Sequence, residues 1–129
     1  MHRLARLAIG TFAVVALAAC SSTGGGAAAS GGGGGTAPCA VTSTAGAVAA
    51  GIKDFAFSPT SVTTKVGDTI TWTNNDPTEH TVTLDSQSSC DTGSIPSGMT
   101  GSITFTAAGT YPFHCKIHSS MHGTITITG

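Results

Sequence analysis

Four residues in the second half of the chain have side chains that commonly bind transition metals. Cys115, His118 and Met121 follow one another at intervals of three residues, and His80 lies 35 residues before Cys115. One thiolate, two imidazoles and one thioether form a mixed set of soft and borderline ligands, which suits copper as it changes between Cu(I) and Cu(II). We therefore predict one copper site made by these four side chains. The alternative is an incidental cysteine at the end of a strand, beside a His-rich turn.

The residues around these ligands have the patterns of β-strands. From about residue 47, apolar and polar residues alternate in short runs that end at turn residues; in 69–74, Ile70 and Trp72 share one face and the threonines the other. Such alternation, without a helical stretch, predicts a small all-β sandwich. Cys115 would end one strand and Thr124 begin the next, so a single short loop would hold three of the ligands.

The same alternation predicts which residues form the core. About 80 residues can bury such a core, although a modest one. We expect a polar loop of roughly 15 residues from Asp85 to interrupt the strands. The expected core residues are Phe55, Phe57, Val62, Val66, Ile70, Trp72, Val82, Leu84, Ile103, Phe105, Tyr111, Phe113, Ile125 and Ile127.

The N-terminus has the features of an export signal. Two arginines precede an apolar run at 7–19, which is too short to span a membrane as a helix and is typical of a signal peptide. The run leads into 17–21 (LAACS), which resembles a bacterial lipobox. We therefore predict that 1–20 is a signal peptide with a lipobox and that a lipid on Cys20 holds the protein on a bacterial membrane, outside the cytoplasm. Ordinary cleavage at a small-residue site is the alternative.

A segment of small residues follows this signal. Residues 21–46 are almost entirely Gly, Ala, Ser and Thr, and such a composition offers too little apolar surface to repay the entropy lost on ordering. We predict a flexible linker over 21–46 and a folded copper-binding domain over 47–129. A flexible chain of this length has an end-to-end distance of about 28 Å, which would hold the domain away from a membrane.

The four cysteines divide by their surroundings. With Cys20 assigned to a lipid and Cys115 to the metal, Cys39 and Cys90 remain. An even remainder in an exported protein suggests a disulfide, which would also keep free thiols away from the copper. The alternative is that Cys39 lies unpaired in the linker.

The charges give no indication of a nucleic-acid partner. Residues 37–129 contain three lysines and six acidic residues. With neutral histidines this net charge has the wrong sign for a phosphate-binding surface, so we expect no nucleic-acid partner.

Five stretches of the folded part carry a family resemblance. They are 54–59 (DFAFSP), 66–74 (VGDTITWTN), 79–82 (EHTV), 105–111 (FTAAGTY) and 111–123 (YPFHCKIHSSMHG). Together they resemble the cupredoxins, the blue copper proteins, and within them the plastocyanin and amicyanin group. The Cys-x-x-His-x-x-Met spacing is similar to the short ligand loop of amicyanins, whereas plastocyanins have a longer interval before the Met.

The resemblance implies a Greek-key sandwich of about eight strands with one copper per chain at one end. His80 would be the isolated ligand, Cys115 the short thiolate ligand, His118 the second imidazole and Met121 the long axial ligand. It also implies a carrier of single electrons between redox protein partners, with electrons passing through His118. Met99 would either join an apolar surface beside His118 or pack as an ordinary loop residue, and we expect a monomer.

The sequence departs from the family's pattern beside the ligands. Many relatives have Pro before the second His, where this chain has Ile117 after Lys116; the lysine charge would act on the reduction potential and on partner choice. Many also have Asn after the first His, where this chain has Thr81. The hydroxyl and backbone of Thr81 could make a similar bond to the Cys loop.

Two other functions use related sites. A copper oxidase or nitrite reductase needs a second copper site with several more histidines, but after the four ligands only His114 and His122 remain in the folded part, so we do not expect an enzyme. Copper storage or delivery would use the same four ligands and remains the alternative to electron transfer. A purely structural domain would bind no metal.

Overall fold

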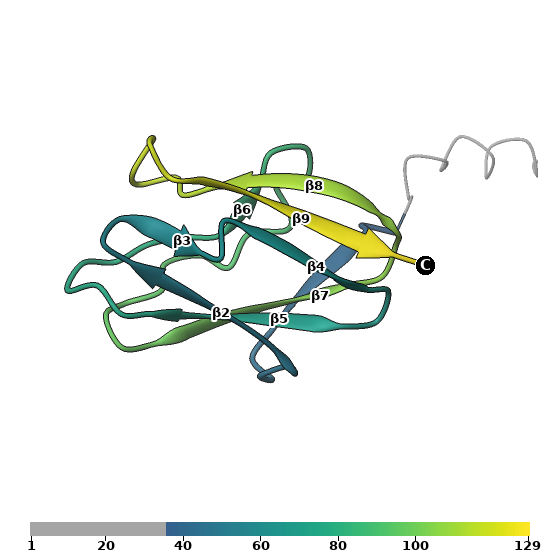
Figure 1. Ribbon diagram of the computed structural model, residues 1–129, viewed down its shortest axis with the longest axis horizontal. Helices are drawn as coiled ribbons and strands as arrows, with labels where there is room; N and C mark the ends of the chain where they lie inside the picture. The colour runs from purple at the N-terminus through teal and green to yellow at the C-terminus, as the bar shows by residue number, and fades with distance from the viewer. Residues whose placement is uncertain (1–35) are drawn as a thin grey trace, which may run out of the picture. The chain divides into compact units, whose positions relative to one another are not determined.

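The computed structural model describes residues 36–129, which contain strands and no helix. The strands are β1 (Cys39–Thr42), β2 (Val48–Lys53), β3 (Ala56–Ser58), β4 (Ser61–Lys65), β5 (Thr69–Asn74), β6 (Thr83–Leu84), β7 (Thr100–Phe105), β8 (Gly109–His114) and β9 (His122–Thr128). They form one sheet in the order β1-β7-β5-β2-β3 and a second in the order β4-β9-β8-β6, stacked as two layers in Figure 1. This confirms the predicted all-β sandwich, with nine strands instead of eight.

The predicted signal peptide 1–20 and the lipid-bearing Cys20 lie outside the described residues. Within 36–129, nothing helical is long and apolar enough to cross a membrane.

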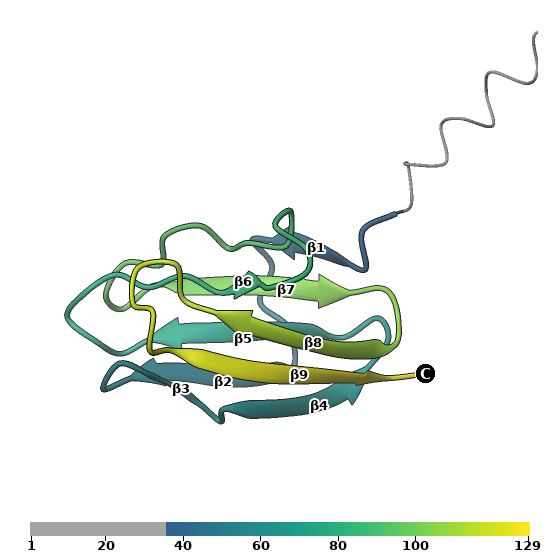
Figure 2. The ribbon, with the colours of Figure 1, turned by 90° about the horizontal axis from the view of Figure 1, so that it is seen from above.

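The strand pairings bring three connections to one end of the sandwich. β2 and β5 run parallel with Ile52 opposite Asn74, so both strands end there. β8 ends at the same place as β9 begins, with His114 opposite His122, and β6 pairs with β8 at Thr83. The turn after β2, the segment between β5 and β6, and the loop between β8 and β9 therefore meet at the left of Figures 1 and 2.

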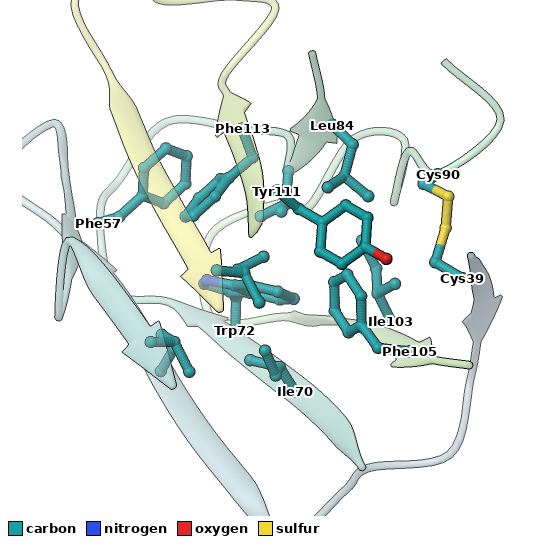
Figure 3. Close-up of a cluster of buried hydrophobic side chains, with 14 of the residues drawn as sticks. Cys39, Phe57, Ile70, Trp72, Leu84, Cys90, Ile103, Phe105, Tyr111 and Phe113 are labelled. Atoms are coloured by element: carbon teal, nitrogen blue, oxygen red, sulfur yellow. A yellow bond between two sulfur atoms is a disulfide. The ribbon is translucent and has the colours of Figure 1, made fainter. Parts of the chain in front are cut away.

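Buried apolar side chains fill the space between the sheets. Trp72, Phe105 and Phe113 are the largest of the fully buried ones, and Figure 3 shows them packed with Phe57 and Tyr111. The close approach of β9 to this core requires a glycine, because a Cβ on Gly123 would lie 2.4 Å from the ring of Phe113. The ligand loop is thus fixed at one end against the core.

Two of the expected core residues are wrong. Phe55 is 50% exposed and Val66 is 42% exposed. Both lie just outside a strand, Phe55 in the turn between β2 and β3 and Val66 directly after β4. The alternation of buried and exposed side chains therefore stops before it reaches either residue. The expected polar loop after Leu84 instead contributes two buried residues, Cys90 and Ile95.

The folded domain also begins earlier than predicted. β1 lies inside the range assigned to the linker, and it pairs with β7 from Cys39 opposite Phe105 to Thr42 opposite Ser102. The boundary at residue 46 is therefore wrong. Composition could not show this, because β1 owes its place to strand pairing and to a covalent bond.

That bond is a disulfide between Cys39 and Cys90. It joins β1 of the first sheet to the segment that follows β6 of the second (Figure 3). The two cysteines are 51 residues apart in sequence and both are buried. The alternative, an unpaired Cys39 in the linker, is therefore wrong.

Candidate metal centre

His80, Cys115 and His118 form the one group among the described residues whose donor atoms could hold a metal ion together. The Cys115 Sγ lies 3.9 Å from the Nδ1 of His80 and 3.8 Å from the Nδ1 of His118, and the two Nδ1 atoms are 3.1 Å apart. His80 and Cys115 are buried, whereas His118 is half-buried. Two of these donors come from the ligand loop and the third from across the sandwich.

The triangle of donor atoms has the size that a transition-metal ion needs. A point in its plane at equal distance from all three atoms lies about 2.1 Å from each, close to the lengths of about 2.0 Å for metal–nitrogen and about 2.3 Å for metal–thiolate bonds. One thiolate and two imidazoles in a trigonal arrangement are the ligands of blue copper sites. The residues present therefore fit a copper ion.

The ligand loop is closed by its own backbone. The Met121 N–H donates to the His118 carbonyl at 3.0 Å, and the Cys115 N–H donates to the Met121 carbonyl at 3.1 Å. Met121 is 2% exposed, so its thioether lies inside the protein at the end of the loop. The loop thereby holds three of the four predicted ligands within seven residues, and the axial role of Met121 remains a prediction.

Thr81 joins the two sides of the site in the way that its hydroxyl and backbone suggested. Its N–H points at the Cys115 Sγ at 3.4 Å, and its Oγ1 accepts a hydrogen bond from the Lys116 N–H at 2.9 Å. An N–H aimed at a sulfur stabilises the thiolate form and orients it. Thr81 therefore contacts both the sulfur and the backbone of the Cys loop.

His80 is held in place by contacts with Ile95 and Asp76. Its backbone exchanges two hydrogen bonds with Ile95, at 3.2 and 2.7 Å. Its ring is 0% exposed and its Nε2 lies 2.8 Å from Oδ2 of Asp76. Neither partner was among the predicted site residues, because Ile95 belongs to the expected polar loop and Asp76 to an expected turn.

The Asp76 carboxylate is buried yet ionised. Burial alone would raise the pKa of Asp76, but hydrogen bonds from the Phe55 and Asp54 amides and from His80 outweigh this effect, so the pKa lies below its usual value of 3.8. The carboxylate accepts from the Asp54 N–H at 2.6 Å and from the Phe55 N–H at 2.9 Å. The same group thus contacts a metal ligand and a hairpin turn.

The Phe55 ring covers the two imidazoles. Its centroid lies 5.0 Å from that of His118 and 5.6 Å from that of His80, edge to face in both cases. Ile117, beside His118 in the loop, is 45% exposed. Met99 is 58% exposed at the same end, where its carbonyl accepts from the N–H of Asn74. Phe55 and Ile117 thus place exposed apolar side chains where His118 reaches the surface, and the role of Met99 beside them stays a prediction.

The charge of Lys116 is paired. Its Nζ lies 2.5 Å from Oδ2 of Asp91. Burial would raise the pKa of Asp91, but hydrogen bonds from Lys116, the Gly93 amide and Thr83 lower it below its usual value. Lys116 therefore brings a compensated charge to the ligand loop.

The two other histidines of the folded part lie outside the donor triangle. His114 and His122 are opposite each other on β8 and β9. The Nδ1 of His114 contacts Oδ1 of Asp85 at 2.5 Å, and the Nε2 of His122 donates to the Ser119 carbonyl at 2.9 Å.

Comparisons with known proteins agree with this geometry. A family model for the cupredoxin-like domain matches residues 11–127. Plastocyanin from Scenedesmus fuscus is 34% identical over 89 residues, which cover 55% of this chain and 85% of the plastocyanin. Amicyanin from Paracoccus denitrificans is 30% identical over 86 residues, which cover 64% of this chain and 66% of the amicyanin.

Solved structures of amicyanin have the same fold. The reduced Cu(I) form, at pH 4, of a proline-to-glycine variant matches with a TM-score of 0.64 at 25% identity, over 71% of this chain and 100% of the amicyanin. The reduced state of a proline-to-phenylalanine variant matches with a TM-score of 0.63 at 25% identity and the same coverage.

Proposed function

Since this chain belongs to the cupredoxin family, whose members bind copper, we propose that it carries single electrons between redox partners outside the cytoplasm. The observation that supports this most is the triangle of one buried cysteine sulfur and two imidazole nitrogens. We assign His80, Cys115, His118 and Met121 as the ligands of one copper ion. Bound there, copper would supply a one-electron change between Cu(II) and Cu(I).

The surroundings of the ligands favour fast electron transfer. His80 is fixed by two backbone hydrogen bonds and a carboxylate, and Cys115 by the Thr81 N–H and by the loop. Ligands that are held in place from all sides move little when the charge at the site changes, so little energy is spent on rearrangement. Copper delivery, part of the alternative, instead requires that the ion leave its ligands readily.

The apolar surface beside His118 is the proposed contact for partners. His118 is the one ligand of the triangle that is partly exposed, and Phe55 and Ile117 flank it with exposed apolar side chains. A small apolar surface around the electron's exit allows brief encounters with a partner. We propose that the protein works as a monomer and that its encounters use this face.

The cellular location rests on sequence and on one structural feature. The disulfide between Cys39 and Cys90 is typical of proteins outside the cytoplasm, which supports export. We propose that the signal at 1–20 directs this export and that a lipid on Cys20 ties the domain to a bacterial membrane by the linker that follows.

Copper retention during redox cycling separates the two functions. The copper-loaded protein would be reduced and reoxidised repeatedly in the presence of a Cu(I) chelator, while the blue absorption and the copper content are followed. An electron carrier is expected to retain its copper over many cycles. Loss of most of the copper to the chelator within the first reductions would contradict electron transfer and favour delivery.

A pair of matched variants tests the contact face. Ile117→Lys places a charge beside His118, whereas Val66→Lys changes a similarly exposed residue, 45% against 42%, at the other end of the sandwich. The electron self-exchange rate, measured by NMR on mixtures of the Cu(I) and Cu(II) forms, should fall at least tenfold in Ile117→Lys and stay near the wild-type value in Val66→Lys. Equal rates in the two variants would contradict this face.

A further inference from the structure

The carboxylate of Asp76 receives three hydrogen bonds at the metal centre. The Asp54 N–H donates to Oδ1 at 2.6 Å, while the Phe55 N–H and the Nε2 of His80 share Oδ2 at 2.9 and 2.8 Å. Each oxygen of this side chain already accepts from a backbone N–H, an arrangement that suits a carboxylate without a proton, and such a group can only accept, so the Nε2 of His80 must carry a proton. The other ring nitrogen, Nδ1, is then unprotonated in the neutral ring, and this is the atom that faces Cys115 and His118.

The turn that supplies two of these donors is strained. Lys53 pairs with Ala56, so Asp54 and Phe55 form a two-residue hairpin with φ of 54° and 57°. Such turns normally have Asn-Gly or Asp-Gly, since a residue with a side chain is strained in the left-handed conformation. A bulky residue stays in this conformation when its surroundings fix it, and the Asp76 carboxylate binds both amides of the turn.

We propose that Asp76 is a positioning residue of the copper site, which selects the His80 tautomer that leaves Nδ1 free and places a negative charge behind His80 that favours Cu(II) over Cu(I). This role rests on the copper ligands assigned above. A carboxylate behind a ligating imidazole orients the ring and makes it a better donor, and a nearby negative charge stabilises a doubly charged ion more than a singly charged one.

The competing role for Asp76 is a purely structural one. The carboxylate would then serve only to hold the hairpin, and the contact with His80 would have no effect on the metal. The hairpin also carries Phe55, whose ring touches both imidazoles, so a change at Asp76 could act through that ring. The experiment therefore has to separate a direct effect of Asp76 on His80 from support of the hairpin and from an effect through the Phe55 ring.

Asp76→Asn is the main variant. It keeps the size of the side chain but removes the charge and one acceptor, so His80 and the two amides can no longer all be satisfied. Asp68→Asn is the matched control, because the Asp68 carboxylate also accepts bonds in a tight turn, from Thr64 and the Lys65 N–H. Lys65 pairs with Thr128 at the end of β9 that lies away from the ligand loop.

The first measurement is the reduction potential of the copper-loaded variants. We expect Asp76→Asn to weaken Cu(II) binding about tenfold relative to Cu(I), which raises the potential by about 59 mV. Asp68→Asn should leave the potential unchanged. Phe55→Gly, which relaxes the turn and removes the ring but keeps Asp76, should shift the potential less than Asp76→Asn does.

The second measurement needs no metal. Long-range ¹H–¹⁵N NMR of the metal-free protein should show His80 protonated at Nε2, with a proton that exchanges slowly with water, and a mixture of tautomers in Asp76→Asn. This wild-type spectrum tests the proposal even if the variant does not fold.

Two results would overturn the proposal. One is a wild-type His80 ring with its proton at Nδ1 or with mixed tautomers. The other is an Asp76→Asn protein that is less stable but has the same reduction potential as the Asp68→Asn control. A wild-type protein without a blue copper signal would instead count against the proposed function, and the tautomer result would still stand.

Discussion

His80 and the loop 115–121 face each other across the metal centre, but they are held in place differently. The loop is a local structure that hydrogen bonds within itself, from Met121 to His118 and from Cys115 to Met121. His80 depends on groups outside this loop: Ile95, and the Asp76 carboxylate, which lies four residues away and also binds the turn between β2 and β3. The spacing of the ligands in the sequence therefore defines only the loop side of this site, whereas tertiary contacts position His80 on the other side.

The largest expected difference between the two sides concerns replacement of their histidines. His118→Gly and His80→Gly should both lose the blue absorption, because each removes an equatorial ligand. Added imidazole should restore it in His118→Gly at a concentration at least tenfold lower than in His80→Gly, since His118 is half-buried and His80 is 0% exposed behind Phe55. Titration of each copper-loaded variant with imidazole, followed by absorption, measures this. Equal titration curves would contradict the expected difference in access between the two histidine positions.

Removal of the disulfide tests how far the long-range side extends. Cys90 lies on the segment that also carries Ile95 to His80. The double variant Cys39→Ala with Cys90→Ala should lose about 4 kcal/mol of unfolding free energy on the chain-entropy model, measured by denaturant unfolding. We expect the blue absorption to keep its wavelength, because neither cysteine touches the ligands, and a shifted band would show that the bridge shapes the site as well.

A smaller effect is expected from the charged pair beside the loop. Lys116→Met leaves Asp91 unpaired and should lower the reduction potential, whereas Asp91→Asn leaves Lys116 unpaired and should raise it. In Lys116→Met the change in unfolding free energy should stay below about 1 kcal/mol, as for other surface ion pairs, because the Lys116 side chain is 53% exposed. Voltammetry of the two variants checks the opposite signs; shifts in the same direction would show that the pair does not act through its charge.

The smallest effect is expected at Asp68, at the end away from the metal. Hydrogen bonds from Thr64 and the Lys65 amide lower the pKa of Asp68 below its usual 3.8, so the folded state binds fewer protons than the unfolded state just below that pH. The stability from these bonds is therefore complete above about pH 5 and is lost as the pH falls through the folded-state pKa. The stability difference between wild type and Thr64→Val should shrink accordingly, with no change in the copper spectrum; a constant difference down to pH 2 would contradict this.

Sequence alone was enough for the fold class and for the side of the site that is local. Alternation of apolar residues predicted the sandwich, since a strand with one buried face must alternate. The spacing of Cys115, His118 and Met121 predicted the ligand loop, and Thr81 was correctly expected to bond to the Cys loop. The first two signals are carried by residues that are close together in the chain, whereas the Thr81 contact joins residues 34 apart and was expected from the family resemblance.

The missed features depend on pairings and contacts that no local sequence pattern shows. β1 looked like linker because its own residues are small and its pairing with β7 lies outside any local window, although the cysteine count did suggest its disulfide. Phe55 looked like a core residue because the hairpin turn has no glycine to reveal it. Asp76 looked like a turn residue. It lies only four residues from His80, but no pattern in the sequence shows that its carboxylate contacts the His80 ring.

The absorption and electron paramagnetic resonance spectra of the Cu(II)-loaded protein test the central claim most directly. If Cys115 is a short thiolate ligand beside the two imidazoles, the protein should show an intense blue band that disappears on reduction, returns on reoxidation, and is absent in Cys115→Ser. The double variant Cys39→Ala with Cys90→Ala is the control for loss of the other cysteines of the folded domain and should keep the band. A pale complex, or a band that survives in Cys115→Ser, would contradict the proposed copper centre.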